Sequence, residues 1–236
     1  MLNYLKMYLP TIMMIKMRYL FLILFFSISA EFYAQEQDFQ TWYIIGVSYN
    51  ISDKLKAGLQ NESRFRENSS IMDRNQTDLG VDYMVFGNMG IGAYYRFISR
   101  DPFNEGFSTQ HRFYTEIDYE FKPLRWEIIP RIRIASDAED TEGLTDAFQN
   151  WIHREKLTVR YNIKKTTFTP YIACEVFFPL QTYEHYLQKY RLFAGFTYKL
   201  NNSNRIGLSL MRQHRFGNSV QSVSTVIMFD YSIKLN

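Results

Sequence analysis

The sequence predicts an all-β protein, an antiparallel up-and-down transmembrane β-barrel of about 10–12 strands. Three observations support this fold class: apolar and polar residues alternate with a period of two, the alternating segments are about 9 to 14 residues long, and their connections alternate in length. The chain has 236 residues, 46% of them hydrophobic, and a mean hydropathy of −0.29. Beyond residue 34 no stretch approaches the roughly 18 apolar residues of a spanning helix. Strands must therefore do any spanning.

The alternation begins at residue 40, where Tyr43, Ile45 and Val47 share one face and Gly46 and Ser48 share the other. Four more segments with the same two faces follow at 55–62, 78–83, 91–100 and 112–119. Six further strands are expected at about 125–135, 151–163, 168–178, 189–200, 205–215 and 223–235. These are eleven segments, whereas single-chain bacterial barrels have even strand numbers, so we expect ten or twelve strands.

The connections give the barrel a direction. Short turns are expected at 52–53, 87–88, 122–123, 164–165 and 201–203, and longer connections at 67–74, 101–109, 136–147, 180–186 and 217–221. Short turns belong on the periplasmic side of an outer-membrane barrel, so the longer connections are expected outside the cell. The longest of them is acidic and contains Asp137, Glu139, Asp140, Glu142 and Asp146.

Aromatic residues and glycines indicate which face is outside. Aromatic residues of the apolar face gather near both strand ends, as in Tyr49 and Tyr83 at the short turns and Phe97 and Trp151 at the longer connections. Two such girdles are typical of a barrel in a membrane. Most glycines fall on the polar face, where a concave interior has least room. The alternative is a water-soluble barrel with its apolar face inside.

The N-terminal segment resembles a secretory signal. Lys16 and Arg18 precede an apolar run from 19 to 30, which ends in small residues. We expect residues 1–34 to be a signal peptide cleaved after Ala34, with Ala30 as the alternative site. Met17 is itself a plausible start, so the first sixteen residues are interpreted as a non-native extension or as part of the signal. The mature barrel domain is expected to span residues 35–236.

If the polar face lines the lumen, its charges alternate in sign from strand to strand. The predicted lumenal charge network consists of Arg96, Arg100, Glu116, Asp118, Arg131, Arg133, Arg154, Lys156, Glu175 and Arg191. One hypothesis is a charge-selective pore in which the basic residues favour anions. The simpler interpretation, which we prefer, is a network of paired long side chains that fills the interior.

Evidence for an enzyme is weak, and the sequence favours a non-enzymatic role. The four histidines have no spacing that specifies a metal site, and no cofactor is expected. Ser108 and His111 are a candidate pair for lipid hydrolysis, although a chance pairing is the better explanation. Cys174 is the single cysteine and cannot form an intramolecular disulfide, so we interpret it as a small apolar side chain. A nearly balanced net charge argues against a nucleic-acid partner.

Several segments are similar to those of a known family. The matching stretches are GAYYR at 92–96, HRFYTEIDY at 111–119, RIR at 131–133, WIHREKLTVRYN at 151–162, TPYIACEVFF at 169–178, KYR at 189–191 and FTYKL at 196–200. They resemble the domain of unknown function 2490 family of predicted outer-membrane barrels, over residues 39 to 235. The resemblance implies the fold and an outer-membrane location in a Gram-negative bacterium, and it carries no activity that could be transferred.

The sequence therefore leads to one main hypothesis and two rivals. The main hypothesis is an exported outer-membrane barrel, either a structural or accessory component or a narrow, porin-like pore. Its expected partners are outer-membrane lipid, lipopolysaccharide and the barrel-assembly machinery. The rivals are a lipid-modifying enzyme of the outer membrane and a soluble periplasmic carrier barrel.

Overall fold

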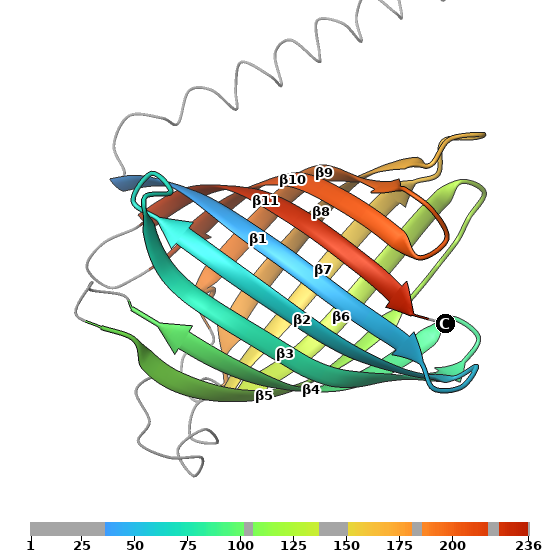
Figure 1. The fold of residues 1–236 in the computed structure, drawn as a ribbon, viewed down its shortest axis with the longest axis horizontal. Helices are drawn as coiled ribbons and strands as arrows, with labels where there is room; N and C mark the ends of the chain where they lie inside the picture. Colours follow the sequence, from blue (N-terminus) through green and yellow to red (C-terminus); the bar gives the residue numbers. More distant parts are fainter. Residues whose placement is uncertain (1–35, 102–105, 137–150, 181–185, 217–221, 236) are drawn as a thin grey trace, which may run out of the picture. The chain divides into compact units, whose positions relative to one another are not determined.

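A computed structural model of the chain describes residues 36–101, 106–136, 151–180, 186–216 and 222–235. These residues form one closed β-barrel in which every strand is followed around the wall by the next strand of the sequence (Figure 1). The predicted all-β barrel is confirmed. The predicted signal segment, residues 1–34, and the acidic connection at 137–147 lie outside the described residues. No helix in the described ranges is long and apolar enough to cross a membrane.

The described residues contain eleven strands. They are β1 (Glu36–Asn50), β2 (Leu55–Arg66), β3 (Ile71–Phe86), β4 (Met89–Arg100), β5 (Ser108–Tyr119), β6 (Trp126–Ser136), β7 (Trp151–Tyr161), β8 (Phe168–Pro179), β9 (Lys189–Lys199), β10 (Asn204–Arg215) and β11 (Ser222–Leu235). Each of the eleven segments seen in the sequence is a strand.

The expected even strand number is wrong for this part of the chain, and the closure of the barrel explains how an odd number is accommodated. In an up-and-down barrel an odd count makes the first and last strands run in the same direction, and β1 and β11 point to the same end in Figure 1. Parallel strands can still hydrogen-bond, with slanted bonds. Tyr43 of β1 also stacks on Phe229 of β11, with ring centroids 5.3 Å apart, so aromatic packing reinforces this seam.

The connections differ in three places from the expected lengths. The short turns predicted at 122–123 and 164–165 are the six-residue connections 120–125 and 162–167. The predicted long connection at 67–74 is a four-residue turn, because β2 ends at Arg66 and β3 begins at Ile71. Glu67, Asn68 and Ser69 all have positive φ angles, which close this turn tightly. The other connections at the same end have six to fourteen residues, against two to six at the opposite end, so the longest connections still lie at one end of the barrel.

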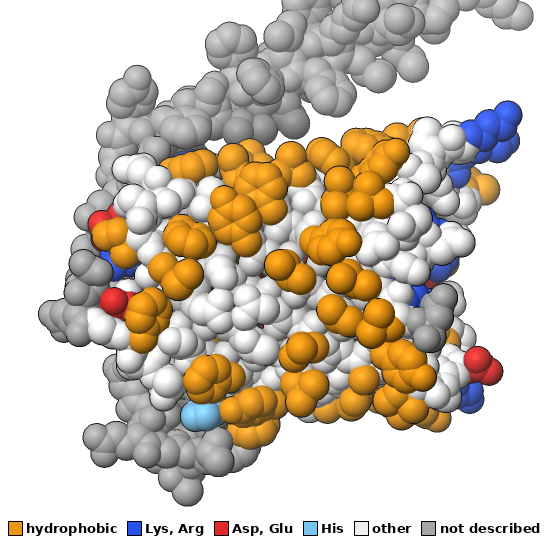
Figure 2. Space-filling model, viewed as in Figure 1, with side chains coloured by type: hydrophobic (Ala, Val, Ile, Leu, Met, Phe, Trp, Pro, Cys, Tyr) orange, Lys and Arg blue, Asp and Glu red, His pale blue; other side chains and the backbone are white. Residues whose placement is uncertain are grey.

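The outer surface of the barrel is apolar along the middle of the strands. Figure 2 shows hydrophobic side chains spread over the visible wall, with charged side chains gathered at its two ends. Leu79 in the middle of β3 is 58% exposed, and Ile172 of β8 is 62% exposed. Other exposed outward residues are Tyr43, Ile45, Leu59, Val81, Ile91, Ile117, Ile132, Ile134, Leu157, Leu192, Leu208 and Leu210.

The inner surface is divided between an apolar wall and a charged wall. Trp42, Ala173, Phe193, Met211 and Val226 form one buried cluster on the inside of β1 and β8 to β11. The remaining strands, β2 to β7, contribute most of the inward charged residues. The interior is therefore packed on one side and polar on the other.

Tyr94 lies across the inside of β3 and β4 because two glycines leave room for its ring. A Cβ atom added to Gly80 or Gly92 would collide with Tyr94. Tyr94 is held in this position by stacking on Tyr114, with centroids 4.6 Å apart, and by a hydrogen bond from its hydroxyl to Asp82. The ring cannot easily move aside, so these glycines are steric requirements of the lumen.

This packing predicts a large difference between two glycine substitutions. Gly80→Ala is expected to destabilise the barrel by about 1–3 kcal/mol, since it forces Tyr94 out of its place. Gly58→Ala on the neighbouring strand is the control, because its nearest neighbour would be 3.8 Å away, and it is expected to be neutral or slightly stabilising. Urea unfolding in detergent micelles measures both changes. Equal effects would contradict the packing account.

Candidate functional site

A cavity of about 560 Å³ lies in the lumen and is lined by residues from both ends of the barrel. Lys56 and Ser232 lie toward the short turns, and Arg100 and Arg215 lie toward the longer connections. Thirteen Lys or Arg residues but only five Asp or Glu residues line it. The cavity is therefore strongly cationic.

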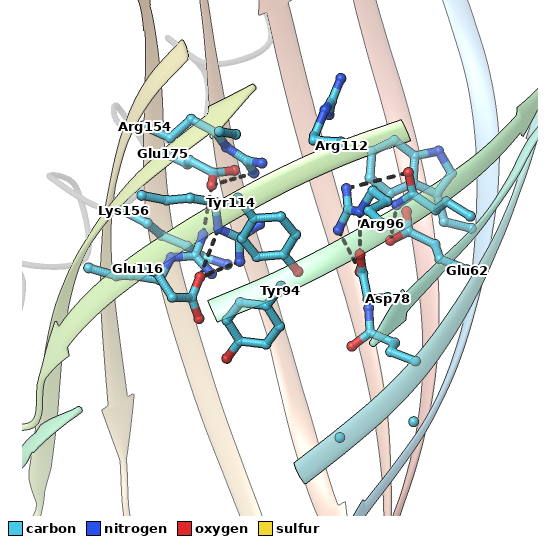
Figure 3. A pocket seen from close by; sticks show the side chains of 18 of the residues that line it. Glu62, Asp78, Tyr94, Arg96, Arg112, Tyr114, Glu116, Arg154, Lys156 and Glu175 are labelled. Atoms are coloured by element: carbon cyan, nitrogen blue, oxygen red, sulfur yellow. Dashed lines mark hydrogen bonds and ion pairs between the residues drawn. The ribbon is translucent and has the colours of Figure 1, made fainter. Parts of the chain in front are cut away.

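The charged side chains form two clusters, which Figure 3 shows on either side of Tyr94 and Tyr114. In the first, the Glu62 cluster, Arg64 Nε donates to Glu62 Oε1 at 2.5 Å and Gln76 Nε2 donates to Glu62 Oε2 at 2.9 Å. Arg96 holds Asp78 with two hydrogen bonds, of 2.5 Å from Nε and 2.6 Å from Nη2. Glu62, Gln76, Asp78 and Arg96 are all buried. Positive and negative charges balance in this cluster.

The second cluster surrounds Glu175 of β8, which is only 2% exposed. Glu175 Oε1 accepts hydrogen bonds from Arg131 Nη2 at 2.9 Å and Arg154 Nη2 at 2.7 Å. Arg191 Nη1 lies 3.6 Å from Glu175 Oε2. One carboxylate thus serves three guanidinium groups.

Glu116 extends the Glu175 cluster along β5 and β6. Its carboxylate accepts hydrogen bonds from Arg133, one of them at 2.7 Å from Nε, and lies 3.5 Å from Arg131 Nη1. Arg131 therefore bridges Glu116 and Glu175. The Glu175 cluster is defined here as Glu116, Glu175, Arg131, Arg133, Arg154 and Arg191.

Aromatic rings contact several lumenal cations, both those that pair with carboxylates and Lys156, which pairs with none of the described carboxylates. Arg64 lies over Trp42 at 3.7 Å and Arg133 over Tyr114 at 4.1 Å. Lys156 Nζ lies over Phe193 at 4.6 Å from the ring centroid. A ring face attracts a cation through its quadrupole, and the attraction is stronger where water is scarce. The apolar wall of the lumen is therefore also an electrostatic partner.

Eight of the ten residues predicted for the lumenal network are brought into these arrangements. Arg96 belongs to the Glu62 cluster, Lys156 lies over Phe193, and the remaining six form the Glu175 cluster. Arg100 lines the cavity at the end of β4. Asp118 lies opposite Arg131 in the strand register and makes no ion pair among the described residues. Whether any of them serves a function remains a prediction.

Sequence reasoning missed the aromatic residues of the lumen. Trp42, Phe177 and Phe193 occupy inward positions, where the polar face was expected. Each is an aromatic residue at a position of the polar face. This departure from the alternation is the sequence signal that could have identified it as lumenal. Lys189 was missed because it stands at the first position of β9, where the alternation has little context.

At the short-turn end, Lys122 joins two carboxylates outside the lumen. Its Nζ lies 2.6 Å from Glu120 Oε2 and 3.7 Å from Glu127 Oε1. Hydrogen bonding with Glu127 raises the pKa of Glu120, because two neighbouring carboxyl groups favour keeping one proton. The hydrogen bond with Glu120 raises the pKa of Lys122. Charges of both signs meet at this end.

The proposed Ser108 and His111 pair is not formed. Residues three apart on a strand point to opposite faces. The Ser108 hydroxyl donates to the carbonyl of Arg100, and His111 Nδ1 lies 2.6 Å from the hydroxyl of Tyr95. Among the described residues no group of three or more His, Cys, Asp or Glu could hold a metal ion.

These features define the chain as a closed β-barrel with an apolar exterior and a cationic, partly open interior. The chain belongs to a family described as a protein of unknown function, DUF2490, whose model matches residues 39–223. The family resemblance seen in the sequence is thereby confirmed.

Other comparisons add one solved structure. The β domain of the Bordetella autotransporter Brka is 12% identical, and the match covers 75% of this chain and 82% of that chain with a TM-score of 0.45. No curated protein matches the chain.

The Glu175 cluster predicts a strong effect of removing one carboxylate. Glu175→Gln leaves three guanidinium groups without their shared anion and is expected to destabilise the barrel by about 3 kcal/mol. Glu155→Gln is the control, because Glu155 lies on the adjacent strand with its side chain 53% exposed, where it lies 3.6 Å from His153 Nε2. It should cost less than about 0.5 kcal/mol. Urea midpoints in micelles measure both, and similar losses would contradict the account.

Proposed function

We propose that this chain is an integral outer-membrane β-barrel whose cationic lumen gives small anions a narrow route across the membrane. The observation that carries the proposal is that the apolar face of the barrel points outward and the polar face points into the lumen. Large apolar side chains are exposed outward along the strands, while thirteen basic and five acidic residues line the cavity inside. A soluble carrier barrel would have the opposite arrangement.

The apolar exterior supports insertion into lipid. An apolar surface that extends over so many strands is far larger than the few hundred Å² that soluble monomers usually expose. In a bilayer the same surface is favourable, and the closed barrel leaves no strand edge unpaired. Exposed aromatic residues near the strand ends, such as Tyr49, Tyr83 and Trp126, would lie at the membrane interfaces.

One polar patch on the exterior is compatible with a lipid environment, because its side chains form hydrogen bonds with one another. Asn61 of β2 donates to Asn75 at 3.0 Å and to Thr77 at 3.0 Å, and Asn75 donates to Ser63 at 2.8 Å. Few amide groups of this patch are left to bond with solvent. Mutual hydrogen bonds reduce the cost of placing polar groups against lipid.

The location and partners follow from the same proposal. A signal peptide at residues 1–34 would bring the chain to the periplasm, where the barrel-assembly machinery would insert it. Its exterior would contact outer-membrane lipid and, on the outer side, lipopolysaccharide. A lumen narrowed by the two charge clusters fits small solutes rather than a wide diffusion pore.

Planar-bilayer recordings test the route directly. The mature chain, residues 35–236, refolded in detergent, is expected to give small conductance steps, and with unequal salt on the two sides the reversal potential should favour anions. A folded, inserted barrel that stays silent would overturn the route. Cation selectivity would contradict the role assigned to the basic lining.

A further inference from the structure

Three cationic side chains converge on the ring of Phe177 inside the lumen. The distances to its centroid are 4.5 Å from Arg154 Cζ, 4.2 Å from Lys189 Nζ and 4.9 Å from Arg191 Cζ. They come from β7 and β9, which flank Phe177 of β8 on either side. All three line the central cavity together with Phe177.

Carboxylates on the protein compensate only part of this charge. Glu175 is the acidic partner of Arg154 and Arg191, and it also serves Arg131. Lys156 lies opposite Glu175 in the strand register, with Phe193 beneath its ammonium group. Neither Lys156 nor Lys189 makes an ion pair or hydrogen bond with another described residue. The group therefore has an excess of more than one positive charge.

Unused hydrogen-bond donors lie at the same place. The Nε atoms of Arg154 and Arg131 are buried and have no hydrogen-bond partner among the described residues. Buried polar groups of proteins are nearly always bonded, so a missing acceptor is expected at such positions. An anion in the cavity would meet the accessible parts of these two side chains, which are 11% exposed for Arg154 and 20% for Arg131, and would add negative charge beside them.

We propose that Arg154, Lys156, Lys189 and Arg191 form a binding site for a phosphate-class dianion. Two guanidinium groups offer planar pairs of donors that match phosphate oxygens, and the two ammonium groups add point charges. A charge excess above one favours a dianion over a carboxylate or a halide. Phe177 contacts Arg154, Lys189 and Arg191 with its ring face, and Phe193 contacts Lys156, so the two rings form the floor of the site.

The proposal deepens the proposed anion route and rests on the same lumen. The ligand could be free inorganic phosphate or the phosphate group of a larger molecule, since both present the same oxygens. The site lies in the half of the lumen toward the longer connections, because Lys189 opens β9 and Arg154 lies near the start of β7.

Isothermal titration calorimetry tests the site. The refolded mature chain in detergent micelles is titrated with inorganic phosphate and, separately, with glucose 6-phosphate, at constant chloride. We expect saturable binding of at least one of them. Tighter binding of phosphate identifies the free ion as the ligand, and tighter binding of the sugar phosphate identifies a phosphomonoester.

Matched lysine variants localise the binding. Lys189→Gln is expected to weaken affinity at least about tenfold, because it removes one charge-assisted contact. Lys56→Gln changes another lysine of the same cavity, which pairs with Asp82 at 2.9 Å, and should leave affinity within about twofold. Lys156→Gln provides a second test if Lys189→Gln does not fold, as judged by heat-dependent gel migration.

Two results would overturn the site. One is the absence of saturable binding to the folded wild-type barrel, and the other is an equal loss in the Lys56→Gln and Lys189→Gln variants, which would indicate diffuse attraction. Failure of the proposed anion route can be told apart from failure of the site. A barrel that binds phosphate in micelles but does not conduct would contradict the route and leave the binding site intact.

Discussion

The structure depends on how a closed barrel with its apolar face outward neutralises the charges that it encloses. Glu175 shows this constraint most clearly, because its single buried carboxylate contacts Arg131, Arg154 and Arg191. A desolvated charge is costly unless it is paired and hydrogen-bonded. The register of β6 to β9 places these residues side by side on the inner wall, so the pairing of the strands and the pairing of the charges specify the same arrangement.

Aromatic side chains stabilise lumenal cations without neutralising them. Trp42, Phe177 and Phe193 face inward and receive cations on their rings. The interior keeps a net positive charge, which a purely structural ion-pair network would not require. The proposed preference for anions follows from that excess.

The sequence predicted the wall of the barrel better than its contents. Period-two alternation located all eleven strands, because the inside and outside differ in polarity at almost every position. An even strand number was expected, because the alternation contains no information about how β1 pairs with β11 to close the barrel. Charged residues such as Arg96 and Glu175 were found on the polar face, but their partners depend on register. Trp42 and Phe177 could be recognised only as exceptions, because their role depends on cations from other strands.

The most direct test of the central claim uses the single cysteine. Cys174 is exposed on the outer face of β8, with Leu157 and Leu192 as its cross-strand neighbours. A nitroxide attached to Cys174 of the reconstituted barrel is expected to be more accessible to dissolved oxygen than to a water-soluble nickel chelate, because this position faces lipid. Greater accessibility to the nickel chelate would place the surface in water and contradict the account.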